Sequence, residues 1–303
     1  MASSGNEEVP GGAPESGGDR PQWPGSGYSQ MPPGPRVHQP PTPLRAALPA
    51  TRSDATVWVV CAAVGFLVGQ IVALIAIAVA AGITGNGNRL ASIENLAAPP
   101  AWYIGSGLVG LWAGFFLGPV LASRVRGTKH LAADLGVAFR PADLWGIAIG
   151  IGGQVLVTLI YLPFISHLSN FNAPTTKLTG GAHGASFLVI SVLTVVGAPF
   201  FEELFFRGLL LRGLLGLFGA TGSRASTGAV RVVLIGLAVV LDGLLFGLAH
   251  GELEQLAGLA VFGCILAVVA LKTQRLGMNM VSHATFNLVA VLAIVSNRSG
   301  VIH

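Results

Sequence analysis

The sequence predicts an all-α membrane protein: a polytopic bundle of about seven transmembrane helices that follows a disordered N-terminal tail. The first observation is composition, because 52% of the 303 residues are hydrophobic and only 10% are charged, whereas soluble domains carry about 25% charged residues. The second is that apolar runs long enough to cross a bilayer recur from residue 54 onward. The third is that basic residues gather at alternate ends of those runs, as in multi-pass membrane proteins.

Residues 1–53 differ in composition from everything that follows. They contain most of the 18 prolines, many glycines and serines, and few large aliphatic residues. Such a segment cannot bury enough apolar surface to offset the entropy lost on ordering, and it lacks the apolar core of a signal peptide. We therefore predict a disordered Pro/Gly-rich cytoplasmic tail.

Apolar runs of suitable length follow the tail. A helix needs about 20 apolar residues to cross about 30 Å of hydrocarbon. The runs that qualify are roughly 56–84, 102–123, 144–168, 185–218, 229–250, 254–272 and 277–297. The fourth run is long for one span, and a kink at Pro199 or a projecting cytoplasmic end would accommodate its length.

The placement of lysine and arginine sets the predicted orientation. Basic residues precede the first run, follow the second, separate the fourth from the fifth and follow the sixth. They are Arg45 and Arg52, then Arg124, Arg126 and Lys129, then Arg212, Arg224 and Arg231, and finally Lys272 and Arg275. Because cytoplasmic loops retain positive charge, we predict a multi-pass protein of the plasma membrane with a cytoplasmic N-terminus.

Other features of the sequence limit the function classes. The stretch from His130 to Asp143 predicts a short interfacial helix with Leu131, Leu135 and Phe139 on one side. The two cysteines each lie inside an apolar run and form neither a disulfide framework nor a metal knuckle. Basic residues with interleaved aromatics do not form a stripe, so a nucleic-acid partner is not predicted.

Charged residues inside the fourth run are the strongest indication of chemistry. An ionisable group at membrane depth is costly and normally faces the protein interior, yet this run contains the segment EELFFR at 202–207. Glu203 and Arg207 are four residues apart and share a helix face, so they can form an ion pair. Glu202 projects from a different face. This division leaves Glu202 free to act as a general base.

Two later runs add polar groups at helical spacing. Phe246 and His250 share one face of the fifth run, and His283 and Asn287 share one face of the seventh. Together with a carboxylate base, two imidazoles and an amide donor suffice to activate a water and stabilise a tetrahedral oxyanion. On the predicted boundaries His250 lies near the outer end of its span and His283 near the inner end, so for a shared site either one depth estimate is wrong or the helices tilt strongly.

As a set, the three motifs Glu-Glu-x-x-x-Arg, Phe-x-x-x-His and His-x-x-x-Asn resemble those of the CPBP family. This family includes the CAAX prenyl endopeptidases and the bacterial proteins of bacteriocin self-immunity. The resemblance covers about 185–297, and every motif position is filled. It implies an abutting-helix core whose site opens towards the cytoplasm. We therefore divide the chain into the tail at 1–53, N-terminal transmembrane helices at 54–180 and a CPBP-like catalytic helical core at 181–303.

The resemblance also implies a role for each motif residue. Glu202 and His250 would activate the water as catalytic residues. His283 and Asn287 would bind the oxyanion. The supporting residues would be Glu203, Arg207 and Phe246.

Two mechanisms fit these residues. The family is usually classed as metalloproteases, and Glu202, His250 and His283 are a plausible zinc set with water in the fourth position. A metal-free glutamate mechanism fits as well, because the sequence has no His-Glu-x-x-His and asparagine is a poor zinc ligand. Zn²⁺ is therefore a candidate cofactor, and the sequence does not choose between the two mechanisms.

Asp242 lies outside the family motifs. It precedes Phe246 by four residues and His250 by eight, which places it roughly on their side of the helix. We expect it to face the cavity, where it tunes His250 or pairs with an arginine. The alternative is a polar group that faces water at the edge of a span.

The leading interpretation is an intramembrane endopeptidase that hydrolyses a peptide bond of a membrane-associated protein or peptide within the lipid bilayer. The alternative is a non-proteolytic membrane protein that uses the same scaffold for immunity or binding, which the intact motif positions disfavour. A proton-coupled transporter would also use buried carboxylates and imidazoles. The lack of an internal repeat makes that third interpretation less favoured.

Overall fold

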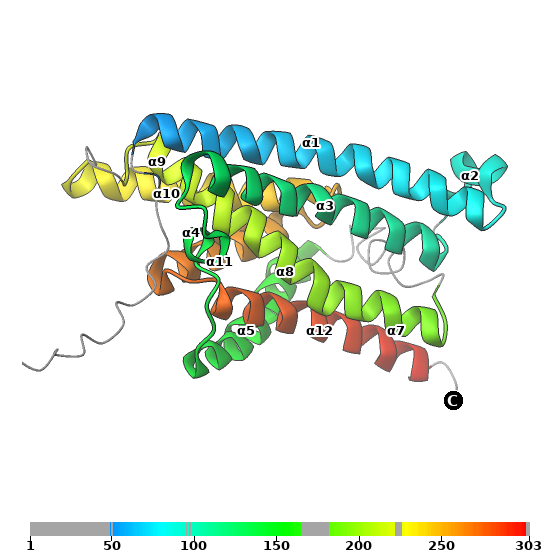
Figure 1. The fold of residues 1–303 in the computed structure, drawn as a ribbon. Helices are drawn as coiled ribbons and strands as arrows, with labels where there is room; N and C mark the ends of the chain where they lie inside the picture. The colour runs from blue at the N-terminus through cyan, green and yellow to red at the C-terminus, as the bar shows by residue number, and fades with distance from the viewer. Residues whose placement is uncertain are drawn as a thin grey trace, which may run out of the picture. The chain divides into compact units, whose positions relative to one another are not determined.

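The computed structural model describes residues 49, 51–94, 96, 98–164, 182–221 and 226–300, and within them it contains helices and no strand (Figure 1). Seven helical stretches there are long and apolar enough to cross a membrane. They are Arg52–Ile83, Ala101–Arg126, Pro141–Phe164, Ala185–Leu217, Gly228–Ala249, Leu256–Thr273 and Gly277–Ser296. The predicted all-α, multi-pass bundle is confirmed. The predicted tail lies outside the described residues except at its C-terminal end.

Most of the spans are single helices. The long helices are α1 (Arg52–Ile83), α3 (Ala101–Arg126), α5 (Gly146–Tyr161), α10 (Gly228–Ala249), α11 (Leu256–Thr273) and α12 (Gly277–Gly300). The fourth span is a continuous series of α7 (Ala185–Val192), η4 (Leu193–Gly197), α8 (Ala198–Glu203), η5 (Leu204–Leu210) and α9 (Leu211–Leu217). Short helices between the spans are η1 (Gly87–Arg89), α2 (Leu90–Glu94) and α4 (Leu131–Leu135), and the third span begins with η2 (Pro141–Trp145) and ends with η3 (Leu162–Phe164).

The first helix begins four residues before the apolar run that predicts it. Thr51 is its N-cap: its side-chain oxygen accepts from the Asp54 backbone N–H at 3.1 Å, and the Thr51 N–H donates to the Asp54 carboxylate at 3.1 Å. This reciprocal capping box satisfies backbone donors that the start of a helix leaves without partners. The polar first turn is therefore helical although hydropathy alone excludes it.

Helices α1 and α3 pack closely along facing glycines. Gly65 and Gly69 of α1 face Gly114 and Gly118 of α3, and Gly110 of α3 faces the Ala73 backbone of α1. The three glycines of α3 recur every four residues. Small residues at this spacing let two backbones approach each other in a membrane, where packing rather than the hydrophobic effect drives association. The α1–α3 pair in turn packs against the fourth span, α1 against α9 and α3 against η5.

Adding a methyl group at Gly114 is expected to destabilise this helix pair. A Cβ there would lie 2.2 Å from the Gly65 carbonyl oxygen and 2.3 Å from the Gly69 nitrogen, both of them backbone atoms. We expect Gly114→Ala to lower the free energy of unfolding by about 1–3 kcal/mol, as overpacking commonly does. The matched control is Gly152→Ala on α5, where no atom lies within 4 Å of the added Cβ. Unfolding in mixed detergent micelles measures both, and equal stability of the two variants would contradict the prediction.

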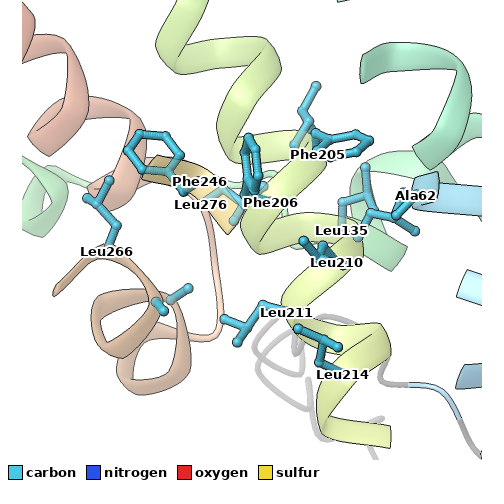
Figure 2. Close-up of a cluster of buried hydrophobic side chains, with 14 of the residues drawn as sticks. Ala62, Leu135, Phe205, Phe206, Leu210, Leu211, Leu214, Phe246, Leu266 and Leu276 are labelled. Carbon is cyan, nitrogen blue, oxygen red and sulfur yellow. The ribbon is translucent and has the colours of Figure 1, made fainter. Parts of the chain in front are cut away.

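The fourth span is the centre of the bundle. Every residue from Leu204 to Gly216 is buried, and Figure 2 shows Phe205, Phe206 and Leu210 of this span within a cluster that also receives Ala62 of α1 and Phe246 of α10. Two segments of the span, η4 and η5, are π-helical and lie on either side of α8. Such segments frequently occur at functional sites.

The predicted interfacial helix at 130–143 is wrong in its length. The helix α4 ends at Leu135, and Gly136 adopts a left-handed φ of 73°. The physical reason is the left-handed C-cap at Gly136, after which the Val137 N–H donates back to the Ala132 carbonyl at 2.7 Å. Asp134 in the last turn is fully buried and accepts hydrogen bonds from the Ser123 hydroxyl at 2.6 Å and the Thr128 N–H at 3.0 Å. Leu135 is buried with it, whereas Phe139 is 61% exposed. The two residues therefore do not share one apolar face.

Candidate active site

Glu203 is the centre of a buried hydrogen-bond network. Its side chain is fully buried. One carboxylate oxygen, Oε1, accepts from Arg207 Nη1 at 3.0 Å and from His283 Nδ1 at 2.9 Å, and the other, Oε2, accepts from Asn279 Nδ2 at 3.3 Å. A carboxylate can be held this deep only when charged or polar donors surround it. The network joins the fourth span to α12.

Arg207 links Glu203 to the hairpin of α10 and α11. Its guanidinium is also fully buried, donates from Nη2 to the Gly263 carbonyl at 3.0 Å, and lies with Nε 3.4 Å from Asp242 Oδ2. It stacks over the Phe246 ring, with Cζ 4.4 Å from the ring centroid, a cation–π arrangement that offsets part of the cost of burying the charge. Asp242 is thus paired with an arginine rather than facing water.

Glu202 points away from this network, towards the two imidazoles. Its Oε2 lies 3.8 Å from His283 Nε2 and 4.0 Å from His250 Nε2, and it has no hydrogen-bond partner among the described residues. The Glu202 side chain is 12% exposed, whereas that of Glu203 is 0% exposed. The two adjacent carboxylates therefore point in different directions, Glu203 into a fully buried network and Glu202 towards the two imidazoles, as the helical spacing predicts.

The second nitrogen of each imidazole has an oxygen partner. His250 Nδ1 donates to the Phe246 carbonyl at 2.8 Å, and His283 Nδ1 donates to Glu203 Oε1 at 2.9 Å. A carbonyl oxygen can only accept, so the Nδ1 atom of His250 carries the proton. In both rings Nε2 is the nitrogen that faces Glu202. Phe246 lies between the rings, 4.8 Å from that of His250 and 5.5 Å from that of His283.

Asn287 is held by the fourth span. Its Nδ2 donates to the carbonyl of Thr194 at 2.8 Å, in the π-helical segment η4. It lies four residues beyond His283 on α12, one turn further along the same face. The structure therefore places Asn287 beside η4, one helical turn from the Glu202–His250–His283 cluster.

The difference in depth between the two histidines is accommodated by the arrangement of the helices. His250 is the C-terminal cap of α10, whereas His283 lies only six residues after the first residue of α12. Both nevertheless come within about 4 Å of the same Glu202 oxygen. His250 at the end of α10 and His283 near the start of α12 therefore meet at Glu202.

Sequence reasoning missed one member of the network, Asn279. Its Nδ2 donates both to Glu203 and, at 2.7 Å, to the Leu266 carbonyl of α11, and its side chain is fully buried. A signal was present, because Asn279, His283 and Asn287 recur every four residues on α12 and so share a face. The carbonyl partners on α11 leave no such signal in the sequence.

The geometry of Glu202, His250 and His283 bears on whether these three side chains can hold a zinc ion. A tetrahedral zinc ion binds histidine nitrogens and carboxylate oxygens at about 2.0–2.2 Å. Among the described residues, no group of three or more His, Cys, Asp or Glu side chains is arranged to hold a metal ion. Glu202 Oε2 lies 3.8 Å from His283 Nε2 and 4.0 Å from His250 Nε2.

An apolar cavity of about 540 Å³ lies beside the site. Its walls come from α1, η5 and α10, and polar surface makes up almost none of its lining. The lining residues are Val59, Ala62, Ala63, Phe66, Leu67, Phe205, Phe206, Leu210, Leu245, Leu248 and Ala249. Phe206 contacts Phe246, with ring centroids 5.3 Å apart, and Ala249 immediately precedes His250. The cavity therefore adjoins the polar cluster.

Comparison with protein families gives one match. Residues 184–289 match the family model described as type II CAAX prenyl endopeptidase Rce1-like. The matched stretch contains all three motifs and Asp242. Comparison with curated proteins and with solved structures found no match. The family match confirms the resemblance that the motifs indicated.

Proposed function

Because residues 184–289 match the family model of the Rce1-like type II CAAX prenyl endopeptidases, we propose that this protein is an intramembrane endopeptidase. Its substrate would be a membrane-associated protein or peptide, cleaved at a peptide bond. One observation supports this proposal above the others: Glu202 Oε2 faces Nε2 of both His250 and His283, at 4.0 and 3.8 Å, at the edge of a buried polar network.

The pair Glu202 and His250 is suited to activating a water. Both facing atoms are hydrogen-bond acceptors, since His250 uses its proton on Nδ1 towards Phe246. Two acceptors 4.0 Å apart can each receive one hydrogen from a single water at about 2.8 Å. Such a water presents its oxygen lone pair to a substrate, and Glu202 is placed to take its proton as a general base.

The rest of the site supplies the charge stabilisation that hydrolysis needs. As the water oxygen bonds to the scissile carbonyl carbon, its proton passes to Glu202 and the carbonyl oxygen becomes an oxyanion. His283 and Asn287 would donate to that oxyanion. Collapse of the tetrahedral intermediate breaks the C–N bond, and the proton held on Glu202 passes to the leaving nitrogen. Glu203 and Arg207 would hold His283 and the fourth span in place.

The apolar cavity supports a substrate with a lipophilic part. A cavity of about 540 Å³ with almost no polar lining can accommodate a hydrocarbon chain or apolar side chains, while a polar backbone segment reaches the adjoining cluster. The charge distribution of the loops supports a cytoplasmic N-terminus, and we propose the plasma membrane as the location. Substrate would then reach the site from the cytoplasmic leaflet.

Peptide cleavage by the reconstituted protein tests the proposal. The full chain in liposomes is incubated with a farnesylated peptide ending in Cys-aliphatic-aliphatic-X, and the released tripeptide is identified by mass spectrometry. We expect the tripeptide to form with the wild type. In parallel, membrane peptides are compared between cells that express wild type and cells that express Glu202→Gln. The proposal is wrong if the probe stays intact and the two peptide profiles are the same.

Metal analysis separates the water-activating pair from the zinc alternative. If Glu202 and His250 activate the water as proposed, removing metal with 1,10-phenanthroline leaves cleavage at the untreated rate, and the purified protein contains no stoichiometric zinc. The physical reason is that a carboxylate and an imidazole that face each other can bind and deprotonate a water without a metal ion. Stoichiometric zinc that is lost in His250→Ala, together with activity restored only by zinc, would instead support the metal mechanism.

A further inference from the structure

One wall of the apolar cavity comes from a helix that lies outside the matched family stretch. The match covers residues 184–289, which include the cavity residues of η5 and α10, whereas α1 is the helix Arg52–Ile83. Five of the lining side chains belong to α1. The size of the cavity is therefore set in part by a helix that the family match does not include.

The cavity opens sideways, between α1 and α10. Its floor is buried and contains Phe205 and Phe206 of η5 (Figure 2). Its rim contains the exposed side chains of Leu67 on α1 and Leu248 on α10. Both helices are long and apolar enough to cross a membrane, so the exposed side of the rim faces hydrocarbon. A hydrocarbon chain can therefore enter the cavity from the bilayer without passing through water.

Aromatic stacking fixes the distance between the α1 wall and the floor of the cavity. The Phe115 ring of α3 stacks on Phe66 of α1, with centroids 6.2 Å apart, and on Phe205 of η5, with centroids 4.3 Å apart. Both Phe66 and Phe205 line the cavity. Behind them, the backbones of α1 and α3 meet closely at Gly65 and Gly114. The wall cannot move outward to admit a larger ligand without breaking these contacts.

The cavity begins where the lipid-bearing residue of a substrate would be held. In a peptide ending in Cys-aliphatic-aliphatic-X, release of the tripeptide breaks the bond after the cysteine, so the modified cysteine carries the carbonyl that is attacked. Its chain must then leave the site within one residue of the Glu202–His250 pair. The lining residue Ala249 immediately precedes His250, and the lining residue Phe206 contacts the Phe246 ring. This continuity favours the chain of the substrate itself over the tail of a bilayer lipid.

We infer that α1 limits the size of the isoprenyl chain that the protein accepts, with Ala63 as the specificity-determining residue. Ala63 lines the cavity and is exposed, so a larger side chain there would occupy cavity space and leave the core intact. Its neighbour Ala62 is buried in the hydrophobic cluster, where a larger side chain would disturb packing instead. This inference rests on the proposed function and names the part of the substrate that the cavity holds.

The test replaces Ala63 by Phe and compares two lipidated peptides. The probes are the farnesylated peptide and the same peptide carrying geranylgeranyl, which is longer by one isoprene unit. The phenyl ring that Phe adds is similar in size to that unit. With the full chain in liposomes, we expect kcat/KM for the geranylgeranylated peptide to fall about tenfold, because excluding even two methylene groups from an apolar site has about this effect. Cleavage of the farnesylated peptide should be nearly unchanged, and Ala63→Leu should give an intermediate ratio.

The matched control is Ala78→Phe. It makes the same change on the same helix, at a position that is exposed and lies outside the cavity lining. We expect the two peptides to be cleaved in the wild-type ratio by this variant. Unfolding in mixed detergent micelles is measured alongside, and both Phe variants should be as stable as wild type. A folded Ala63→Phe protein that also keeps the wild-type ratio would overturn the role of Ala63.

A labelling measurement follows the chain without cleavage. A peptide with a diazirine on its isoprenyl chain is irradiated in liposomes that contain the full-length protein, and labelled tryptic fragments are identified by mass spectrometry. We expect label on the α1 fragment Ser53–Arg89, and we expect excess unlabelled farnesylated peptide to remove it. With a geranylgeranyl probe the label on this fragment should fall in Ala63→Phe and persist in Ala78→Phe.

The outcomes separate the inference from the proposed function. If the wild type cleaves neither peptide but α1 is labelled competitively, the proposed function fails for these substrates and the chain-binding role of α1 is supported. Label confined to helices other than α1 would overturn the inference. It would also be overturned if a diazirine phospholipid labels the same fragment and the farnesylated peptide does not displace it, because the cavity then holds bilayer lipid.

Discussion

Replacing Glu202 by Gln is expected to lower the cleavage rate by about 10²–10⁴-fold, the contribution that a positioned general base makes. The substituted amide would keep the size of the side chain but could not take the proton of the water. Because Glu202 Oε2 has no hydrogen-bond partner in the described structure, the change breaks no internal contact of that atom. The fold should therefore be retained or slightly stabilised.

The measurement pairs activity with stability. Release of tripeptide from the farnesylated probe is compared between wild type and Glu202→Gln in the same liposomes, and unfolding is followed in detergent. The matched control is Asp54→Asn, a carboxylate-to-amide change in the first turn of α1 and outside the site. A folded Glu202→Gln protein that cleaves as fast as wild type would favour the non-proteolytic interpretation of the scaffold.

Replacing Arg207 by Met is expected to have the largest effect on stability. The guanidinium is fully buried and contacts Glu203, Asp242 and the Gly263 carbonyl. Methionine fills much of the same space against the Phe246 ring, but it leaves a buried carboxylate without its cation. We expect the free energy of unfolding to fall by about 3–5 kcal/mol, as when one partner of a buried ion pair is removed.

A double variant distinguishes lost charge compensation from lost packing. In Arg207→Met with Asp242→Leu the carboxylate that depends most on the arginine is also gone, while Glu203 keeps His283 and Asn279 as donors. We expect the double variant to recover part of the stability, so the two effects should not add. Unfolding in mixed detergent micelles measures all three proteins. A double variant less stable than Arg207→Met alone would contradict this account of the network.

Much of the architecture could be predicted because hydropathy acts on whole spans. Most ends of the seven spans lie within a few residues of the predicted runs, since a run of apolar residues in a membrane must satisfy its backbone within one helix. The errors occur at helix ends that are set by a cap and not by hydropathy. Thr51 and Asp54 extend α1 past its apolar run, and the left-handed C-cap at Gly136 ends the helix that was expected to continue to residue 143.

The candidate site could be predicted as far as helical spacing reaches. The division of Glu202 from Glu203, the pairing of Glu203 with Arg207 and the direction of Asp242 all follow from positions on one helix. What could not be predicted is which backbone carbonyls complete the site. Gly263 binds Arg207 and Thr194 binds Asn287, and a carbonyl group is the same in every residue.

The two π-helical segments of the fourth span have a consequence for how this region tolerates insertions and deletions. Each segment is wider than an α-helical turn, and together they flank the six residues of α8 that end in the two glutamates. Deleting one residue early in η5 would restore a regular helix there. The residues that follow, Arg207 among them, would then be rotated about the helix axis. Natural variants of this region should accordingly differ by substitution and keep the count of residues between Leu193 and Leu210 fixed.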